Sequence, residues 1–141
     1  MEWLTAIRKS IDYIETHLKE DITVQDIANQ VFLSSLHFQR GFLIVTGYSV
    51  SEYIRNRRLY LSAIELKQTS KKIIDIAYDY GYETPESFSK AFTRFHGTTP
   101  IKIKQGGHIY GFEVKTVNGE EECKLHFNNY YSCYNVTIFS I

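Results

Sequence analysis

The sequence predicts a mainly α-helical fold in which two helix–short turn–helix units are joined by a long central helix, with a β-hairpin-like tail after them. Three observations predict this fold. Residues 50–68 carry apolar side chains at helical spacing, and a similar short pattern stands on each side of this stretch. Beyond residues 106–107, a Gly-Gly pair, the apolar residues alternate with polar ones instead, which is typical of strands.

The central helix has its own start signal. Ser49 precedes it and Glu52 follows three residues later, which is the pattern of a capping box. A helix of this length spans roughly 25–30 Å at about 1.5 Å per residue. The apolar positions that we expect to be buried are Tyr53, Ile54, Leu59, Tyr60, Ala63 and Leu66.

The first unit lies before the central helix, at residues 24–46. An amphipathic helix near the N-terminus precedes it, with apolar residues every three or four positions from Trp3 to Leu18. Thr23 can cap the first helix of the unit, with Asp26 at its third position. A short break at residues 32–35 leads to a second helix over about 36–46, which Gly47 ends. Its predicted inward residues are Phe38, Phe42 and Val45.

The second unit lies after the central helix, at residues 73–96. Its second helix begins with Thr84 as cap, Pro85 at the first position and the acidic Glu86 in the first turn, all of which favour a helix start. Gly97 ends this helix, and Pro100 starts a last short helix that runs to about residue 105. The predicted inward residues of the second helix are Phe88, Phe92 and Phe95.

The two units align as an internal repeat. Residues 26–28 (Asp-Ile-Ala) match residues 75–77 (Asp-Ile-Ala), and the turn of the second copy holds one extra residue. Gly81 can take the left-handed backbone of a tight turn, whereas the first copy holds Phe32 there, a poorer turn residue. The second helices match as Phe38…Arg40…Phe42…Gly47 against Phe88…Lys90…Phe92…Gly97.

The charge of the chain is unevenly distributed. Lys plus Arg and Asp plus Glu both number 16, so the formal net charge is zero. Residues 34–104 nevertheless carry eleven basic and six acidic residues, a net charge of +5. A basic middle between acidic ends permits a phosphate-binding face.

Several other classes of protein are disfavoured. Cys123 and Cys133 have no neighbouring His or Cys at metal-ligand spacing, so we expect reduced thiols and no metal site. The five histidines form no spaced cluster, and we expect neither catalysis nor a cofactor. The sequence has no apolar run of membrane-spanning length and no signal peptide, so we expect a cytoplasmic protein without membrane contact.

The tail, residues 106–141, alternates around an Asn118-Gly119 pair, which predicts a hairpin turn. Because an isolated hairpin is marginal in water, it must pack on the helical part, pair with another chain or begin a larger β-containing domain. The alternating residues are Tyr110, Phe112 and Val114, then Cys123, Leu125 and Phe127.

Residues 73–100 resemble the signature of the AraC/XylS transcription regulators, through Ile76-Ala77, Gly81-Tyr82, residues 88–92 (Phe-Ser-Lys-Ala-Phe) and residues 95–100 (Phe-His-Gly-Thr-Thr-Pro). Residues 47–66 resemble it as well, and the likeness covers roughly residues 1–105. The resemblance implies a seven-helix domain with two helix-turn-helix units that binds specific sequences of double-stranded DNA. It also implies transcription activation, with RNA polymerase as a partner. An effector domain often accompanies such domains, so the tail is interpreted as a possible stub of one, with a small-molecule effector if that domain follows.

The resemblance also assigns contacts to individual residues. In each unit the second helix would enter the major groove, where Gln pairs with adenine, Arg with guanine and an apolar side chain with a thymine methyl. The expected base contacts are Ser35, Leu36, Gln39, Arg40, Pro85, Glu86, Ser87 and Lys90. The residues expected to contact phosphates, or alternatively to pair internally, are Thr84, Arg94, Arg55, Arg57 and Arg58.

A second function stays open at this point. The same helical frame can hold a protein partner without binding DNA specifically. The basic residues on the two reading helices favour DNA over such an interaction module, and the salt dependence of binding separates the two.

Overall fold

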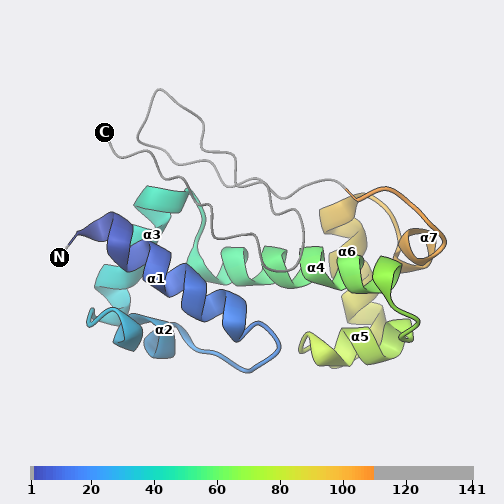
Figure 1. Ribbon diagram of the computed structural model, residues 1–141, viewed down its shortest axis with the longest axis horizontal. Helices are drawn as coiled ribbons and strands as arrows, with labels where there is room; N and C mark the ends of the chain where they lie inside the picture. The colour runs from blue at the N-terminus through green and yellow to red at the C-terminus, as the bar shows by residue number, and fades with distance from the viewer. Residues whose placement is uncertain (1, 110–141) are drawn as a thin grey trace. The chain divides into compact units, whose positions relative to one another are not determined.

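The computed structural model describes residues 2–109, and over these residues the chain is mainly helical, as predicted (Figure 1). None of the described helices is long and apolar enough to cross a membrane. The predicted hairpin, residues 110–141, lies outside the described residues. The seven helices of the described part are α1 (Trp3–Thr16), α2 (Val24–Gln30), α3 (Ser35–Thr46), α4 (Val50–Gln68), α5 (Ile73–Asp79), α6 (Pro85–His96) and α7 (Pro100–Lys104).

The predicted helix starts and ends are confirmed by hydrogen bonds. The Thr23 hydroxyl oxygen accepts from the Asp26 backbone N–H, and the Asp26 carboxylate accepts from the Thr23 N–H and from the Thr23 hydroxyl. The two bonds to the carboxylate hold the pKa of Asp26 below its usual value. Ser49 and Glu52 form the same box before α4. Gly47 and Gly97 end α3 and α6 with φ of 77° and 71°, which only glycine adopts without strain.

The described chain forms two compact units. Unit 1 contains α1, α2, α3 and the first residues of α4, and unit 2 contains residues 18–21 and 55–109. The core of unit 1 is a set of fully buried aromatic and aliphatic side chains, in which the Phe42 ring lies 5.6 Å from the Phe38 ring and 5.5 Å from the Tyr53 ring. The other buried apolar residues of this core include Ile7, Ile11, Ile14, Ile27, Ala28, Val31 and Val50.

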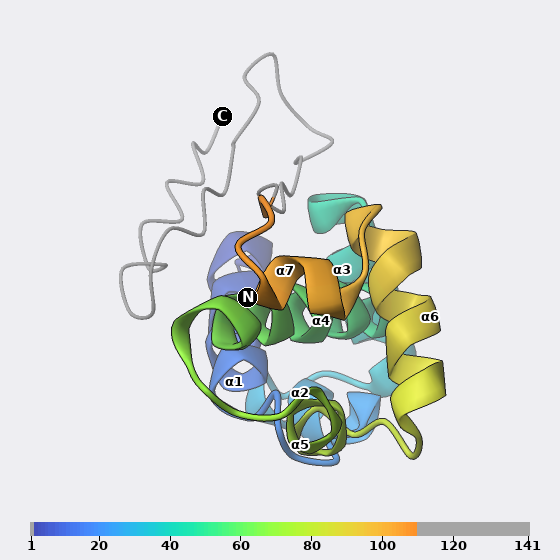
Figure 2. The same ribbon diagram turned by 90° about the vertical axis from the view of Figure 1, so that its right-hand side faces the viewer.

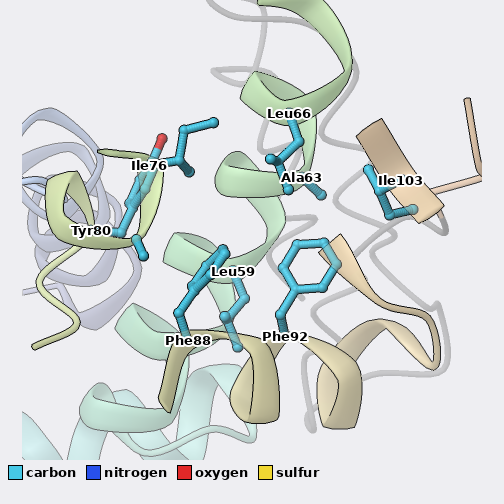
Figure 3. Packing of buried hydrophobic residues seen from close by; sticks show 9 residues of the cluster. Leu59, Ala63, Leu66, Ile76, Tyr80, Phe88, Phe92 and Ile103 are labelled. Carbon is cyan, nitrogen blue, oxygen red and sulfur yellow. The ribbon is translucent and has the colours of Figure 1, made fainter. Parts of the chain in front are cut away.

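Unit 2 is packed around the C-terminal part of α4. Figure 2 shows α5, α6 and α7 around this helix, and Figure 3 shows the side chains that fill the space between them. The Phe88 and Phe92 rings of α6 lie 5.5 Å apart and point at α4. The cluster consists of Leu59, Ala63, Leu66, Ile76, Ala77, Tyr80, Phe88, Phe92 and Ile103, all buried. Phe88 and Phe92 thereby fix which face α6 leaves to solvent.

The turns of the two helix-turn-helix units have the same backbone. In unit 1 the Leu33 N–H donates to the Ala28 carbonyl at 3.1 Å, and in unit 2 the Tyr82 N–H donates to the Ala77 carbonyl at 3.0 Å. The residue before each donor is left-handed, with φ of 58° at Phe32 and 83° at Gly81. Phe32 therefore adopts the conformation for which it was predicted to be poorly suited, because the turn geometry requires it.

Phe32→Gly is expected to stabilise unit 1 by about 0.5–1 kcal/mol. A left-handed residue with a Cβ costs roughly 1–2 kcal/mol, and the extra freedom of glycine in the unfolded chain returns part of this. Little packing is lost, because Phe32 is 83% exposed. The Lys9 ammonium lies 5.8 Å from the centre of its ring. Urea unfolding measures the change.

The matched control for this substitution is Gly81→Ala, at the same point of the second turn. It is expected to destabilise by about 1 kcal/mol or more, because alanine must adopt the φ of 83° that glycine adopts freely. Equal changes in the free energy of unfolding for both substitutions would show that the backbone at Phe32 is not strained.

His96 links the end of α6 to the central helix by a hydrogen bond. Its Nε2 lies 2.9 Å from the Leu59 carbonyl oxygen, and because a carbonyl only accepts, Nε2 carries the proton and donates. The ring also lies 4.2 Å from the Phe92 ring. Burial lowers the pKa of His96 below its usual 6.5, and the hydrogen bond to Leu59 opposes this only in part.

The stability of unit 2 is therefore expected to fall as the pH drops below about 6.5. Between the lowered pKa and 6.5 the unfolded chain binds more protons at His96 than the folded chain, so the free energy of unfolding rises with pH across this interval. The slope from one such group stays below about 1.4 kcal/mol per pH unit. Urea unfolding at pH 7.5 and 5.5 measures the change in the free energy of unfolding between the two pH values, and this change should be smaller in His96→Gln. The same change in that variant would show that groups other than His96 cause the pH dependence.

Candidate nucleic-acid interface

The exposed face of α3 carries most of the base-contact residues predicted for unit 1. Ser34 caps the helix by accepting from the His37 N–H at 3.2 Å, so the first turn is well fixed. Leu36, Gln39 and Arg40 are all exposed, and within the described residues no hydrogen bond or ion pair engages the Arg40 guanidinium. The guanidinium and the Gln39 amide therefore keep their full hydrogen-bonding capacity for a partner.

Ser35 differs from the other predicted contacts on α3. Its side chain is half-buried, and its hydroxyl donates to the Gln25 side chain on α2. This bond holds the start of α3 against α2 and uses the only proton of the hydroxyl. Ser35 thus fixes the position of the helix, and only its oxygen lone pairs are left for an external donor.

The start of α6 is fixed by a pair of hydroxyl groups. Thr84 accepts from the Ser87 N–H at 3.1 Å and its hydroxyl donates to Ser87 Oγ at 3.0 Å, while Ser87 Oγ–H donates to the Thr84 carbonyl. Pro85 is half-buried, whereas Glu86, Ser87 and Lys90 are exposed. Lys90 and Glu86 are thus the accessible charged residues in the first two turns of α6.

The three arginines of α4 differ in their burial and in their contacts, although the sequence analysis treated them as one group. Arg57 is only 1% exposed, and its guanidinium lies 5.4 Å from the centre of the Tyr60 ring. The expected phosphate contact is therefore wrong for Arg57, because its side chain is buried inside the protein.

Arg58 is also used internally. Its Nε and Nη2 donate to the backbone carbonyls of Leu18 and Glu20, each at 2.8 Å, which ties residues 18–21 to unit 2. Arg55 and Arg94 are exposed and stay as candidates for phosphate contacts. Burial raises the pKa of the nearby Tyr82, against the opposing charges of Arg55 and Arg58, so its hydroxyl stays protonated at neutral pH.

Two exposed residues of α3 were missing from the predicted contacts. Leu43 and Ile44 are 50% and 59% exposed, and Leu43 stands two helical turns after Leu36 on the same face. The internal repeat could have identified these two residues as exposed. It aligns Leu43 and Ile44 with Thr93 and Arg94, which are exposed on α6. The sequence interpretation paired only the positions expected to touch bases.

A glycine on the other side of α3 was also missed. A Cβ on Gly41 would lie 2.1–2.6 Å from the atoms of the Trp3 ring, so the indole of α1 lies directly against the backbone of α3. The same ring lies 5.9 Å from the His37 ring. Glycine in a helix interior normally weakens it, and here the missing side chain is the space that Trp3 occupies.

Chemically, the two faces offer hydrogen-bond donors, a guanidinium and an ammonium on helices whose starts are rigidly capped. Groups of this kind pair with base edges in the major groove and with phosphates.

Comparison with known proteins agrees with this architecture. Residues 18–106 match the family described as "Helix-turn-helix domain". The chain is 41% identical over 100 residues to the HTH-type transcriptional regulator YbfP of Bacillus subtilis, covering 71% of this chain and 34% of YbfP. It is 38% identical over 94 residues to the regulatory protein SoxS of Salmonella typhimurium, covering 67% of this chain and 88% of SoxS. The chain thus spans about a third of one relative and most of the other.

A solved structure has the same fold. The crystal structure of a transcriptional regulator from Chromobacterium violaceum, described as an AraC-type DNA-binding domain-containing protein, superimposes with a TM-score of 0.70 at 25% identity and covers 72% of this chain and 91% of that chain. The fold, the family match and the relatives agree with the resemblance found in the sequence. The chain belongs to the AraC/XylS family of transcription regulators, with a helix-turn-helix DNA-binding domain at residues 18–106.

Proposed function

We propose that this chain binds specific sequences of double-stranded DNA by placing α3 and α6 in adjacent segments of the major groove, and that it activates transcription together with RNA polymerase. The observation that carries the proposal is the repeated unit. Each copy has the same turn hydrogen bond, and each second helix is capped by a side chain at its start. Each also exposes a cation at the same position, Arg40 in one and Lys90 in the other.

The central helix supports the proposed reading of two segments by one chain. It is continuous for 19 residues, about 28 Å at 1.5 Å per residue. Successive major-groove segments on one face of DNA are roughly 34 Å apart. The length of this helix is thus comparable to the spacing of the two segments that the proposal requires one chain to read.

The proposed contacts follow from exposure. Leu36, Gln39 and Arg40 on α3, and Glu86, Ser87 and Lys90 on α6, would lie against bases. Ser35 and Pro85, both half-buried, would lie at the edge of the contact. Thr84, Arg55 and Arg94, all exposed, would contact phosphates.

The rival function is a protein-interaction module without specific DNA binding. Selection of bound sites from random duplexes separates the two, because the proposal requires two preferred blocks about one helical turn apart. Titration of the selected duplex at several salt concentrations then gives a log–log slope near −0.9 for each phosphate contacted. Selection of no common sequence, with binding insensitive to salt, would favour the protein-interaction module. Recovery of a single block would contradict the reading of two segments.

A further inference from the structure

The two helices proposed to read DNA differ in the chemistry of their exposed faces. At three of the exposed positions that align between the two helices, α3 has Leu36, Leu43 and Ile44, where α6 has Glu86, Thr93 and Arg94. The α3 side chains are 50–60% exposed. The repeated backbone thus presents apolar side chains on α3 at three positions where α6 presents polar ones.

The apolar residues of α3 lie in a row with its only charge. Leu36, Arg40 and Leu43 follow each other at spacings of four and three residues, which places them side by side along one line of the helix. Over Ser35–Thr46 the helix contains no acidic residue, and Arg40 is its single charged one. An acid-free face with a central guanidinium complements the negative major groove.

The chemistry of the row points to particular bases. In the major groove a guanidinium pairs with guanine, whereas the group that an apolar side chain can bury is the C5 methyl of thymine. Leu36 and Leu43 are seven residues apart, about 10 Å along the helix, which corresponds to about three base pairs.

We infer that the α3 face is a thymine-methyl reader: Leu36 and Leu43 each cover the methyl of a thymine, about three base pairs apart, on either side of the base that Arg40 contacts. The inference rests on the proposed DNA binding and names the sequence class that one of its helices selects. The α6 face, with Glu86 and Thr93 at the aligned positions, reads its block by hydrogen bonds. The two blocks of the binding site therefore differ in composition.

Substitution of deoxyuridine for thymidine tests this directly, because it removes the methyl and leaves base pairing intact. On a duplex obtained by site selection, each thymidine is replaced in turn and the affinity of the full chain is measured. Two positions in one block, about three base pairs apart, should each lose about fourfold in affinity, the equivalent of exposing one CH₂ group. Replacements in the other block should have little effect.

Protein variants assign the methyls to side chains. In Leu43→Ala the penalty for deoxyuridine should disappear at one of the two positions and persist at the other, and Leu36→Ala should do the reverse. Thr93→Ala on α6 is the matched control, because it stands at the position aligned with Leu43 and should leave both penalties unchanged. Circular dichroism of each variant checks that the exposed substitutions leave the helices folded.

The outcomes separate this inference from the proposed function. Specific binding to a selected duplex without any deoxyuridine penalty would overturn the thymine reader alone, and would leave the apolar face to a protein partner. A penalty that persists in Leu36→Ala and Leu43→Ala would also overturn it. Failure to select any sequence would overturn the DNA-binding proposal and this inference together.

Discussion

Phe92→Ala is expected to lower the free energy of unfolding by about 3–5 kcal/mol, the largest effect of a single substitution that we expect in this chain. The Phe92 side chain is fully buried among α4, α6 and α7 (Figure 3). Its ring lies between those of Phe88, at 5.5 Å, and His96, at 4.2 Å. Its loss would leave a cavity in the hydrophobic core that packs α6 against α4. Urea unfolding followed by circular dichroism measures the effect.

The next residue along α6 provides the control for this prediction. Thr93 is exposed, so Thr93→Ala should change the free energy of unfolding by no more than about 0.5 kcal/mol. If Phe92→Ala proved as stable as the unchanged chain, the packing of α6 on α4 described here would be wrong.

Arg40→Ala is expected to weaken binding to a selected duplex by about 1–3 kcal/mol and to relax the preference for guanine at one position of the site. The Arg40 side chain is exposed and has no hydrogen bond or ion pair within residues 2–109, so its removal should leave the fold unchanged. Affinities for the selected duplex and for single-base variants of it measure both effects.

Two comparisons make the Arg40 result specific. Arg40→Lys keeps the charge but loses the two-pronged hydrogen bonding of the guanidinium, so it should recover affinity on all sequences more than it recovers the base preference. An equal loss on every duplex in Arg40→Ala would show that the side chain contacts only phosphate.

Local sequence signals were sufficient for the helices of this fold. The capping residues Thr23, Ser49 and Thr84 and the terminal glycines Gly47 and Gly97 stand where the helices begin and end. Each of these signals acts within four residues of the chain, so it can be recognised without knowledge of tertiary contacts.

Burial along α4 was harder to predict. A helix with one buried face repeats its apolar residues, but α4 also buries Arg57, Ser62 and Glu65, because side chains from several elements cover it. Composition alone places an arginine at the surface, and only the packed structure shows that Arg57 lies inside. For the same reason the three arginines of this helix were grouped together although their surroundings differ.

Phe32 shows a limit of residue preferences as a predictor of backbone conformation. Residue preferences assign glycine to a left-handed turn position, and the second copy of the unit follows this rule at Gly81. In the first copy the hydrogen bonds of the turn impose the same φ on a bulky residue. The backbone hydrogen bonds of the turn override the residue preference there, and the internal repeat, which aligns Phe32 with Gly81, was the signal in the sequence that placed it in the turn.

The indole of Trp3 against Gly41 has a practical consequence. The chain contains a single tryptophan, and it belongs to unit 1, where its ring touches the backbone of α3. Intrinsic fluorescence excited at the indole therefore reports on that half alone, without an attached dye. A melt followed at once by indole emission and by ellipticity would reveal whether the two halves come apart in one cooperative step or one after the other.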